Sequence, residues 1–208
     1  LAERLTSGEE ILTKIEDCIV EAKYDGFRLQ CHKKGNEIEI FSRKLERMTE
    51  MLPDVIESIK NEIDVDEIIF EGEAIGYNEK EKKFYSFQQT MQRKRKYEID
   101  KKSEEIPLKL FMFDVMFYKG KDVTSLPLKE RKKIMEKIIK KNKNVQMSEG
   151  YYIKTPEQIE EKFNEFINRG LEGLMAKDLN SPYIAGARKF SWIKLKKSYK
   201  TELSDTID

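Results

Sequence analysis

The chain has 208 residues, and its 40 basic and 39 acidic side chains nearly cancel to a net charge of +1. This balance argues against a protein that coats a polyanion through overall charge, although local basic clusters remain open. The length suffices for a buried core, as one large domain or two small ones. Without a membrane-length apolar run, and with Cys18 and Cys31 flanked by strand-like residues, we expect a soluble, cytoplasmic protein with reduced thiols.

The first predicted elements are a helix and a hairpin. Residues 6–10 resemble a helix cap with acidic residues in the first turn, followed by apolar residues at helical spacing. Alternating residues at 27–31 and 38–41 flank a Lys-Gly-Asn turn and predict a β-hairpin. We expect this hairpin to place Arg28 in the same structural unit as Lys23.

Lys23 is the candidate nucleophile. It follows a strand-like apolar run at 18–20 and precedes an Asp25-Gly26 turn, at a predicted sheet edge. An unperturbed lysine, with a pKa of about 10.4, is almost fully protonated at neutral pH. Neighbouring cations such as Arg28 would lower this pKa and free the lone pair that a nucleophile needs. The alternative is a solvated lysine beside an ordinary turn.

The middle of the chain alternates helices with apolar strands. Residues 44–60 predict two short helices that are separated by a break at Pro53. Nearly continuous apolar runs at 68–76 and 108–117 predict buried strands. The first of these strands carries Glu73, whose burial without a metal, hydroxyl or base partner would be costly.

A compact cationic run, Arg93-Lys94-Arg95-Lys96, lies between these two strands. Two interpretations are open. The run is either a solvated helix end or a contact with phosphates along a nucleic-acid backbone.

The last third of the chain predicts outer helices at 128–141 and from Thr155 onward, then strands near 174–177 and 191–196. No internal repeat is present. Hairpins mixed with scattered helices favour an α+β fold over a doubly wound parallel sheet.

Charged side chains of both signs stand on the predicted strands, which suggests one shared charged ligand. A nucleoside triphosphate with magnesium matches them, because cations suit phosphate oxygens and carboxylates suit the metal or the ribose. The single histidine, His32, and the lack of a Gly-x-x-x-x-Gly-Lys-Ser/Thr loop argue against a histidine-based triad, a histidine-rich zinc site and a P-loop. The charged residues are Lys23, Arg28, Glu73, Glu172, Lys177, Lys194 and Lys196.

Six segments, in order, resemble the nucleotidyltransferase motifs of ATP-dependent DNA ligases, most closely the archaeal and eukaryotic replicative type. Their joint occurrence is far more specific than any single match. The resemblance spans the whole chain, including Gln92 to Tyr97 and the closing Ser204 to Asp208. The segments are KYDGFR at 23–28, FSR at 41–43, FEGEA at 70–74, FMFD at 111–114, EGLMAK at 172–177 and WIKLK at 192–196.

The resemblance implies a single adenylation domain over 1–208, with an ATP-grasp-like core of antiparallel sheets flanked by helices. It implies that Lys23 attacks ATP and holds AMP, which passes to a DNA 5′-phosphate before a 3′-hydroxyl seals the nick. The process serves DNA replication, repair and recombination, and its cofactors are ATP and Mg²⁺.

The resemblance also implies residue roles. Glu21 would contact the adenine amino edge, Phe113 would stack on the ring, and Arg28 with Glu73 would hold the ribose. Glu73 and Glu172 would support magnesium. The predicted phosphate contacts are Arg43, Lys177, Arg188, Lys194 and Lys196, and the predicted DNA contacts are Arg93, Lys94, Arg95 and Lys96.

The family's N-terminal DNA-binding domain and C-terminal oligonucleotide-binding barrel are expected to be absent from this chain, which would leave a piece that binds ATP or keeps AMP on Lys23 but seals nicks poorly. The expected partner is nicked double-stranded DNA, bound by a monomer on the chromosome and not at a membrane. A sliding clamp would be contacted only through regions outside this chain. Two alternatives remain: an RNA ligase or messenger-RNA capping guanylyltransferase, and a non-catalytic nucleic-acid-binding module of the same fold.

Overall fold

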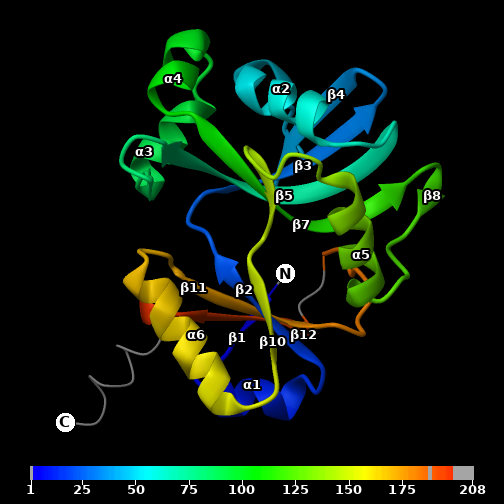
Figure 1. Cartoon of the computed structure of the whole chain (residues 1–208), viewed down its shortest axis with the longest axis vertical. Helices are drawn as coiled ribbons and strands as arrows, with labels where there is room; N and C mark the ends of the chain where they lie inside the picture. The colour runs from blue at the N-terminus through cyan, green and yellow to red at the C-terminus, as the bar shows by residue number, and fades with distance from the viewer. Residues whose placement is uncertain (1, 187–188, 199–208) are drawn as a thin grey trace. The chain divides into compact units, whose positions relative to one another are not determined.

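The structure is a computed structural model that describes residues 2–186 and 189–198. The chain divides into two units, each with its own sheet and helices (Figure 1). Unit 1 contains the chain up to Tyr24, residues 127–129 and the C-terminal part from Glu149. Unit 2 contains residues 25–126 and 130–148.

Unit 1 is a five-stranded sheet with two helices. The strand β2 lies between β11 and β10, and every pairing is antiparallel except that of β1 with β12. In sheet order the strands are β1 (Ala2–Arg4), β12 (Lys189–Lys196), β11 (Gly173–Asp178), β2 (Cys18–Lys23) and β10 (Gly150–Ile153), and the helices are α1 (Gly8–Lys14) and α6 (Pro156–Asn168).

Both helices of unit 1 begin at side-chain caps. Ser7 accepts a hydrogen bond from the backbone N–H of Glu10, which satisfies a donor that the first turn of α1 would leave unpaired. Thr155 and Gln158 form a reciprocal capping box at α6, with Pro156 in the first turn. Helix α6 then packs its buried Ile159, Phe163 and Phe166 toward β2 and β11.

Unit 2 is built on a seven-stranded sheet. Its main path is β4 (Glu37–Ser42), β3 (Phe27–Lys34), β5 (Glu67–Asn78), β7 (Leu108–Tyr118) and β8 (Lys121–Asp122), while β6 (Lys83–Phe84) pairs with β5 and β9 (Val145–Met147) pairs with β7. Its helices are α2 (Pro53–Glu62), α3 (Phe87–Met91), α4 (Ile99–Glu105) and most of α5 (Leu128–Ile138), with 3₁₀ turns η1 (Thr49–Met51) and η2 (Gln92–Lys94).

Buried charged groups fasten the helices of unit 2 to its sheet. The fully buried Arg131 of α5 donates from Nε to Oδ1 of Asp114 on β7 over 2.7 Å. The carboxylate of Glu62, at the end of α2, accepts from the backbone N–H groups of Asn144 and Val145 at 2.9 and 3.0 Å. These contacts satisfy polar groups that would otherwise be costly to bury.

The expected order of a short helix, a break and a second helix is found at 49–62, as the 3₁₀ helix η1 followed by α2. Pro53 does not interrupt a helix but begins α2, where its missing N–H costs nothing. One expectation about local structure is wrong. Arg28 does not share a unit with Lys23, because β2 closes its part of unit 1 and β3 opens unit 2 in a different sheet. Between them, Gly26 packs so closely that an added Cβ would lie 2.1 Å from the carbonyl oxygen of Ala74.

The helices within the described ranges are too short or too polar for a membrane crossing. Cys18 and Cys31 are both buried free thiols, as expected.

Candidate active site

The sheet of unit 1 has an apolar face and a charged face. Successive residues of a strand point to opposite faces, so Val20 and Ala22 of β2 share one face while Glu21 and Lys23 share the other. Directly paired residues of neighbouring strands lie on the same face. Lys23 ends β2, which is an inner strand and not the predicted sheet edge.

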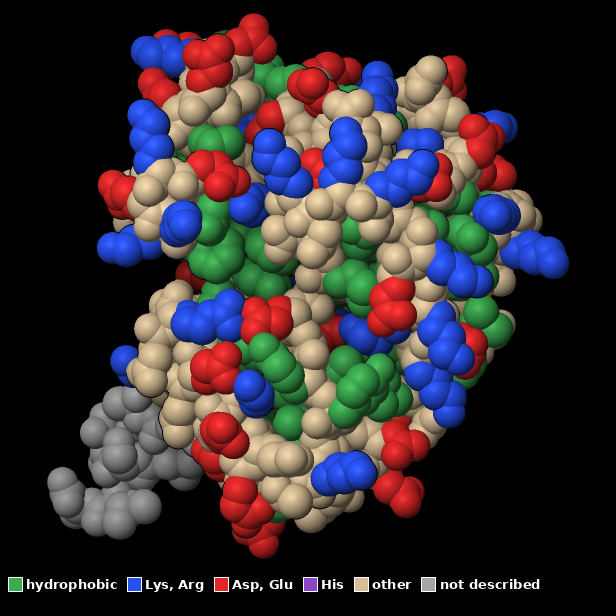
Figure 2. Space-filling view, viewed as in Figure 1, with side chains coloured by type: hydrophobic (Ala, Val, Ile, Leu, Met, Phe, Trp, Pro, Cys, Tyr) green, Lys and Arg blue, Asp and Glu red, His purple; other side chains and the backbone are tan. Residues whose placement is uncertain are grey.

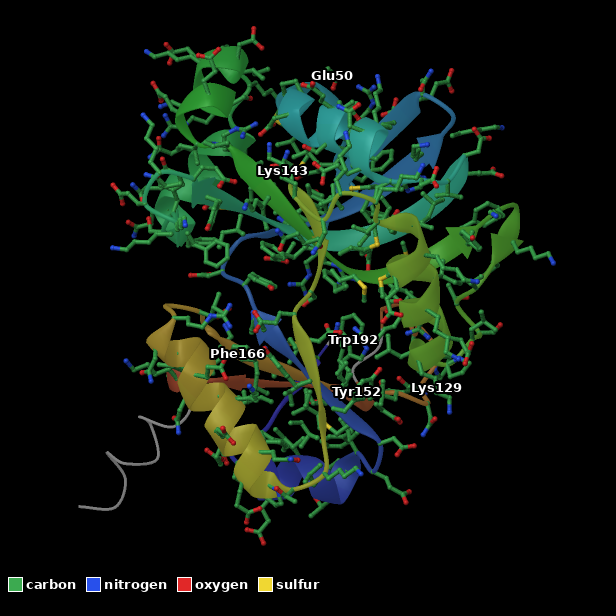
Figure 3. The ribbon with its side chains drawn as sticks, in the orientation of Figure 1. Glu50, Lys129, Lys143, Tyr152, Phe166 and Trp192 are labelled. Carbon is green, nitrogen blue, oxygen red and sulfur yellow. The ribbon has the colours of Figure 1, made fainter. Side chains whose placement is uncertain are left out.

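The charged face is ordered in three rows across β12, β11 and β2. Strand register therefore gathers five of the predicted residues, Glu21, Lys23, Lys177, Lys194 and Lys196, from distant parts of the sequence. The rows are Lys196, Gly173 and Lys23; then Lys194, Met175 and Glu21; then Trp192, Lys177 and Ile19. Figure 3 labels Trp192, which lies opposite Lys177 in the third row.

Lys23 is held by a carboxylate that it shares with a second lysine. Its Nζ lies 2.6 Å from Oε2 of Glu172, and Nζ of Lys196 pairs with Oε1 of the same group. All three side chains are about one quarter exposed, at 22%, 24% and 25% for Lys23, Glu172 and Lys196. The carboxylate of Glu172 stabilises the ammonium form of Lys23. The predicted ring of cations around Lys23 is therefore only partly present, because Lys196 is close but pairs with the same carboxylate.

Gly173 makes this arrangement possible. It sits between Lys23 and Lys196 in the first row, at a φ of +149°. An added Cβ would lie 2.0 Å from the carbonyl oxygen of Leu195, which is an atom of the neighbouring backbone and cannot move aside. Glycine therefore lets β12 approach close enough to bring Lys196 beside Glu172.

We expect Gly173→Ala to lower the free energy of unfolding by roughly 2–4 kcal/mol, because it adds a backbone clash to an unfavourable φ. The matched control is Gly170→Ala, at φ +80° with nothing within 4 Å of its Cβ, which should cost about 1 kcal/mol. Chemical denaturation of both variants measures the difference. Equal losses would show that the approach of β12 does not need a glycine at 173.

Glu21 and Lys177 form a buried ion pair. Their side chains are 1% and 2% exposed, and Nζ of Lys177 also lies 4.2 Å from the ring centroid of Trp192. An ammonium that is held by a carboxylate and covered by an indole is poorly placed to contact a phosphate. The predicted phosphate contact of Lys177 is thus not supported by its surroundings.

Unit 2 carries a second group of predicted residues. Arg28 of β3 lies directly opposite Glu73 of β5, and its guanidinium carbon is 5.3 Å from the ring centroid of Phe113. A carboxylate partner of Arg28 is Glu71, which accepts from its Nε at 3.2 Å and is almost fully buried. Glu71 was missed from the sequence, although the Glu-Gly-Glu spacing on a strand already places both carboxylates on one face.

Phe113 lies at an irregularity in β7. Glu71 pairs with Asp114 and Gly72 pairs with Met112, so Phe113 is an extra residue in the ladder. Such β-bulges re-aim side chains and are common beside active sites. Phe113 therefore stands outside the regular pairing of β5 with β7, and its ring lies beside the guanidinium of Arg28.

The predicted cationic run does not act as one surface. Arg93 is 2% exposed, and its guanidinium donates to Asp54 at 2.6 and 2.9 Å and to the carbonyl of Ile106 at 2.8 Å. The surroundings of Arg93 do not support the predicted DNA contact, because its side chain already joins α2 to the segment that ends at Ile106. Arg95 and Lys96 are exposed and Lys94 is half-buried.

One of the remaining predicted residues lies in an exposed turn, and the other lies outside the described residues. Arg43 is exposed in the turn after β4, next to Ser42, whose Oγ accepts from the backbone N–H of Lys44 at 3.2 Å. Arg188 lies outside the described residues, as does the C-terminal run from Ser204 to Asp208.

Other nucleophiles and bases are poorly suited to chemistry. Burial raises the pKa of the Cys18 thiol to about 12 and raises that of Cys31 as well, so neither forms a thiolate near neutral pH. His32 is hydrogen-bonded to Gln30 at 2.9 Å, and partial burial lowers its pKa. Within the described residues, these features leave the charged face of unit 1 as the strongest candidate site.

The sequence profile of the family described as "ATP dependent DNA ligase domain" matches residues 1–196. The chain belongs to this family, as its motifs predicted. The predicted α+β nucleotidyltransferase fold is confirmed by the similarity of this chain to solved DNA ligase structures.

Among curated proteins, the chain is 46% identical to a probable DNA ligase of Dictyoglomus turgidum over 208 residues, which cover all of this chain and 36% of that protein. It is 43% identical to a DNA ligase of Sulfolobus acidocaldarius over 211 residues, covering 35% of that protein. The chain thus spans about one third of the length of these relatives.

Solved structures of similar fold include a mycobacterial DNA ligase D complexed with ATP and MES, at 22% identity and a TM-score of 0.68, covering 95% of this chain and 60% of that one. Another is Chlorella virus DNA ligase-adenylate, at 16% identity and a TM-score of 0.56, covering 94% of this chain and 68% of that one. At these identities the likeness establishes the fold alone.

Proposed function

We propose that this chain is the adenylation part of an ATP-dependent DNA ligase. The observation that carries the proposal is the placement of Lys23, at the end of β2, on one carboxylate with Lys196. Lys23 takes AMP from ATP, the AMP passes to the 5′-phosphate of nicked double-stranded DNA, and the 3′-hydroxyl displaces it to seal the nick. The protein acts inside the cell as a monomer, and any clamp contact uses other regions.

The first step is a nucleophilic displacement at phosphorus. The Nζ lone pair of Lys23 attacks the α-phosphorus of ATP, a P–N bond forms, and the bond to the bridging oxygen breaks. Pyrophosphate leaves with that electron pair, and the amine loses a proton to solvent. Glu172 stabilises the ammonium form of Lys23, whereas the attack requires the neutral amine. The neutral amine is favoured when Glu172 pairs with another cation instead, and Lys196 already pairs with it.

Each unit, taken by itself, carries residues to which we assign nucleotide contacts. In unit 1, Glu21 accepts from the adenine amino group, while Lys194 and Lys196 neutralise phosphate charge. In unit 2, Phe113 stacks on the base, and Arg28 and Glu73 hold the ribose. Glu71 keeps the guanidinium of Arg28 in place, and Arg43 and Arg188 complete the phosphate contacts.

A magnesium site is compatible with the carboxylates of the described residues. No group of three or more histidine, cysteine, aspartate or glutamate side chains in these ranges is arranged to hold a metal by itself. Mg²⁺ commonly takes one or two carboxylates and completes its shell with substrate phosphates and water. Glu172 in unit 1 and Glu73 in unit 2 are each hard oxygen donors of the kind that this ion prefers. When bound, the ion would withdraw charge from the reacting phosphate.

Intact-mass measurement after incubation with ATP and Mg²⁺ tests the proposal. We expect an AMP-sized increment that peptide mapping locates on Lys23, and little labelling by GTP. Preferential labelling by GTP would favour a capping guanylyltransferase, and transfer to an RNA end in preference to nicked DNA would favour an RNA ligase. DNA binding without any nucleotide label would favour a non-catalytic module.

DNA binding is assigned to the exposed part of the cationic run. Figure 2 shows acidic and basic side chains interspersed over the visible face, so a local cluster must supply the attraction. We expect Lys94→Gln/Arg95→Gln/Lys96→Gln to weaken nicked-DNA binding and to reduce the salt dependence of the binding constant by roughly one ion per lost phosphate contact. Fluorescence anisotropy at several salt concentrations measures both.

The control for this experiment is Lys133→Gln, which removes one exposed cation from α5. It should leave both the affinity and its salt dependence nearly unchanged. If the triple variant behaves like Lys133→Gln, the DNA surface lies elsewhere. If it loses AMP transfer but keeps DNA affinity, the run belongs to the nucleotide site.

A further inference from the structure

The buried ion pair of Glu21 and Lys177 favours the ionised form of the Glu21 carboxyl group. The two residues lie diagonally across β2 and β11, since Glu21 pairs with Met175 and Lys177 pairs with Ile19. Their side chains are 1% and 2% exposed, so neither charge is compensated by bulk water. The indole of Trp192, opposite Lys177 on β12, lies 4.2 Å from the ammonium and contributes a cation–π contact.

This environment determines what Glu21 can bind. A buried carboxyl group without a cation tends to take up a proton and become a donor as well as an acceptor. With Lys177 beside it, the ionised form is favoured, and an ionised carboxylate only accepts hydrogen bonds. An acceptor-only group matches a base edge that carries an amino group and opposes an edge that carries a carbonyl oxygen.

We infer that Lys177 is a positioning residue for base selection, which keeps Glu21 ionised and aimed so that the site prefers a purine triphosphate with a 6-amino group. The inference rests on the proposed function, in which Glu21 contacts the base. Lys177 touches neither the base nor the phosphates and acts through Glu21. A site built around a specific hydrogen bond can reject the mismatched analogue strongly, because the mismatch leaves a buried polar group unpaired.

The test compares labelling of Lys23 by ATP and by inosine triphosphate, which carries a carbonyl at the 6-position and the same ribose and phosphates. Single-turnover rates are measured by intact mass on the full-length protein. We expect Lys177→Met to lower the ATP-to-inosine triphosphate rate ratio by about tenfold or more. Lys177→Gln, which keeps a hydrogen-bond donor but no charge, should lower it similarly, whereas Lys177→Arg should retain most of it.

Lys194→Met is the matched control, because Lys194 lies on the same face in the next row and is assigned to the phosphates. It should slow both nucleotides by the same factor and leave the ratio unchanged. Removing one partner of a buried ion pair is destabilising. If Lys177→Met does not fold, the comparison of Lys177→Gln with Lys177→Arg decides.

The outcomes separate the inference from the proposed function. An unchanged ratio in a folded Lys177→Met or Lys177→Gln protein would overturn the inference and leave a purely structural ion pair. An arginine variant that loses the ratio as fully as the neutral ones would also overturn it. A wild-type protein that takes label from both nucleotides equally contradicts the inference alone, while one that takes no label from ATP contradicts the proposed function and the inference together.

Discussion

Lys23→Arg is expected to abolish the AMP-sized mass increment while leaving the fold intact. Arginine keeps the positive charge that Glu172 binds, so the ion pair at the end of β2 can persist. A guanidinium is not deprotonated in proteins and therefore offers no amine lone pair to phosphorus. Labelling should fall below detection in intact-mass spectra, and the thermal unfolding midpoint should stay close to that of the wild type.

Two further variants complete this experiment. Lys23→Ala should also lose the label, but it leaves Glu172 with one cation fewer and is the harsher change. Lys133→Arg, at an exposed position on α5, should be labelled normally. An increment that survives Lys23→Arg would place the AMP on another residue and would contradict the assignment of the nucleophile.

Asp114→Ala is expected to give the largest loss of stability. Its carboxylate and the guanidinium of Arg131 are both completely buried, and the pair joins β7 to α5 through bonds of 2.7 and 3.2 Å. Removing the carboxylate leaves a buried cation without its counter-charge, which typically costs about 3–5 kcal/mol. The free energy of unfolding from denaturant titration measures this loss.

The matched control is Glu130→Gln, which removes a carboxylate from the same helix and breaks only an exposed pair with Lys133. Its cost should stay within about 0.5 kcal/mol. Asp114→Leu/Arg131→Met should recover much of the loss, because no charge is then buried alone. If Asp114→Ala lowers the free energy of unfolding no more than Glu130→Gln does, Arg131 must find another partner or reach water.

Most long elements were predictable because their patterns are strong. The apolar run at 108–117 became β7, and the Thr155 cap with its spaced apolar residues became α6. Strands of two to four residues, such as β8 and β9, are too short to show periodicity. Helix α4 has no buried residue and so lacked the amphipathic pattern that would have revealed it.

The sequence named candidate site residues, but it gave no information on how they pair. The motifs singled out Lys23, Glu172 and Lys196 as candidates. Only strand register shows that both lysines share a single carboxylate. In the same way, Arg93 belonged to a cationic run with two open interpretations, and neither indicated its partner Asp54, which comes from a helix distant in the sequence.

The extra residue in β7 has a consequence for protein engineering. Met112 and Val115 both lie in the apolar core although they are three positions apart, a spacing that a regular strand cannot give. A chain lacking Phe113 would bring them to the ordinary two-residue spacing and would remove this one irregularity from the pairing of β5 with β7. Insertion or deletion of the single codon for Phe113 would therefore add or remove the aromatic ring without other changes to the core. We expect a protein of the same fold without this ring to be obtainable by that one deletion.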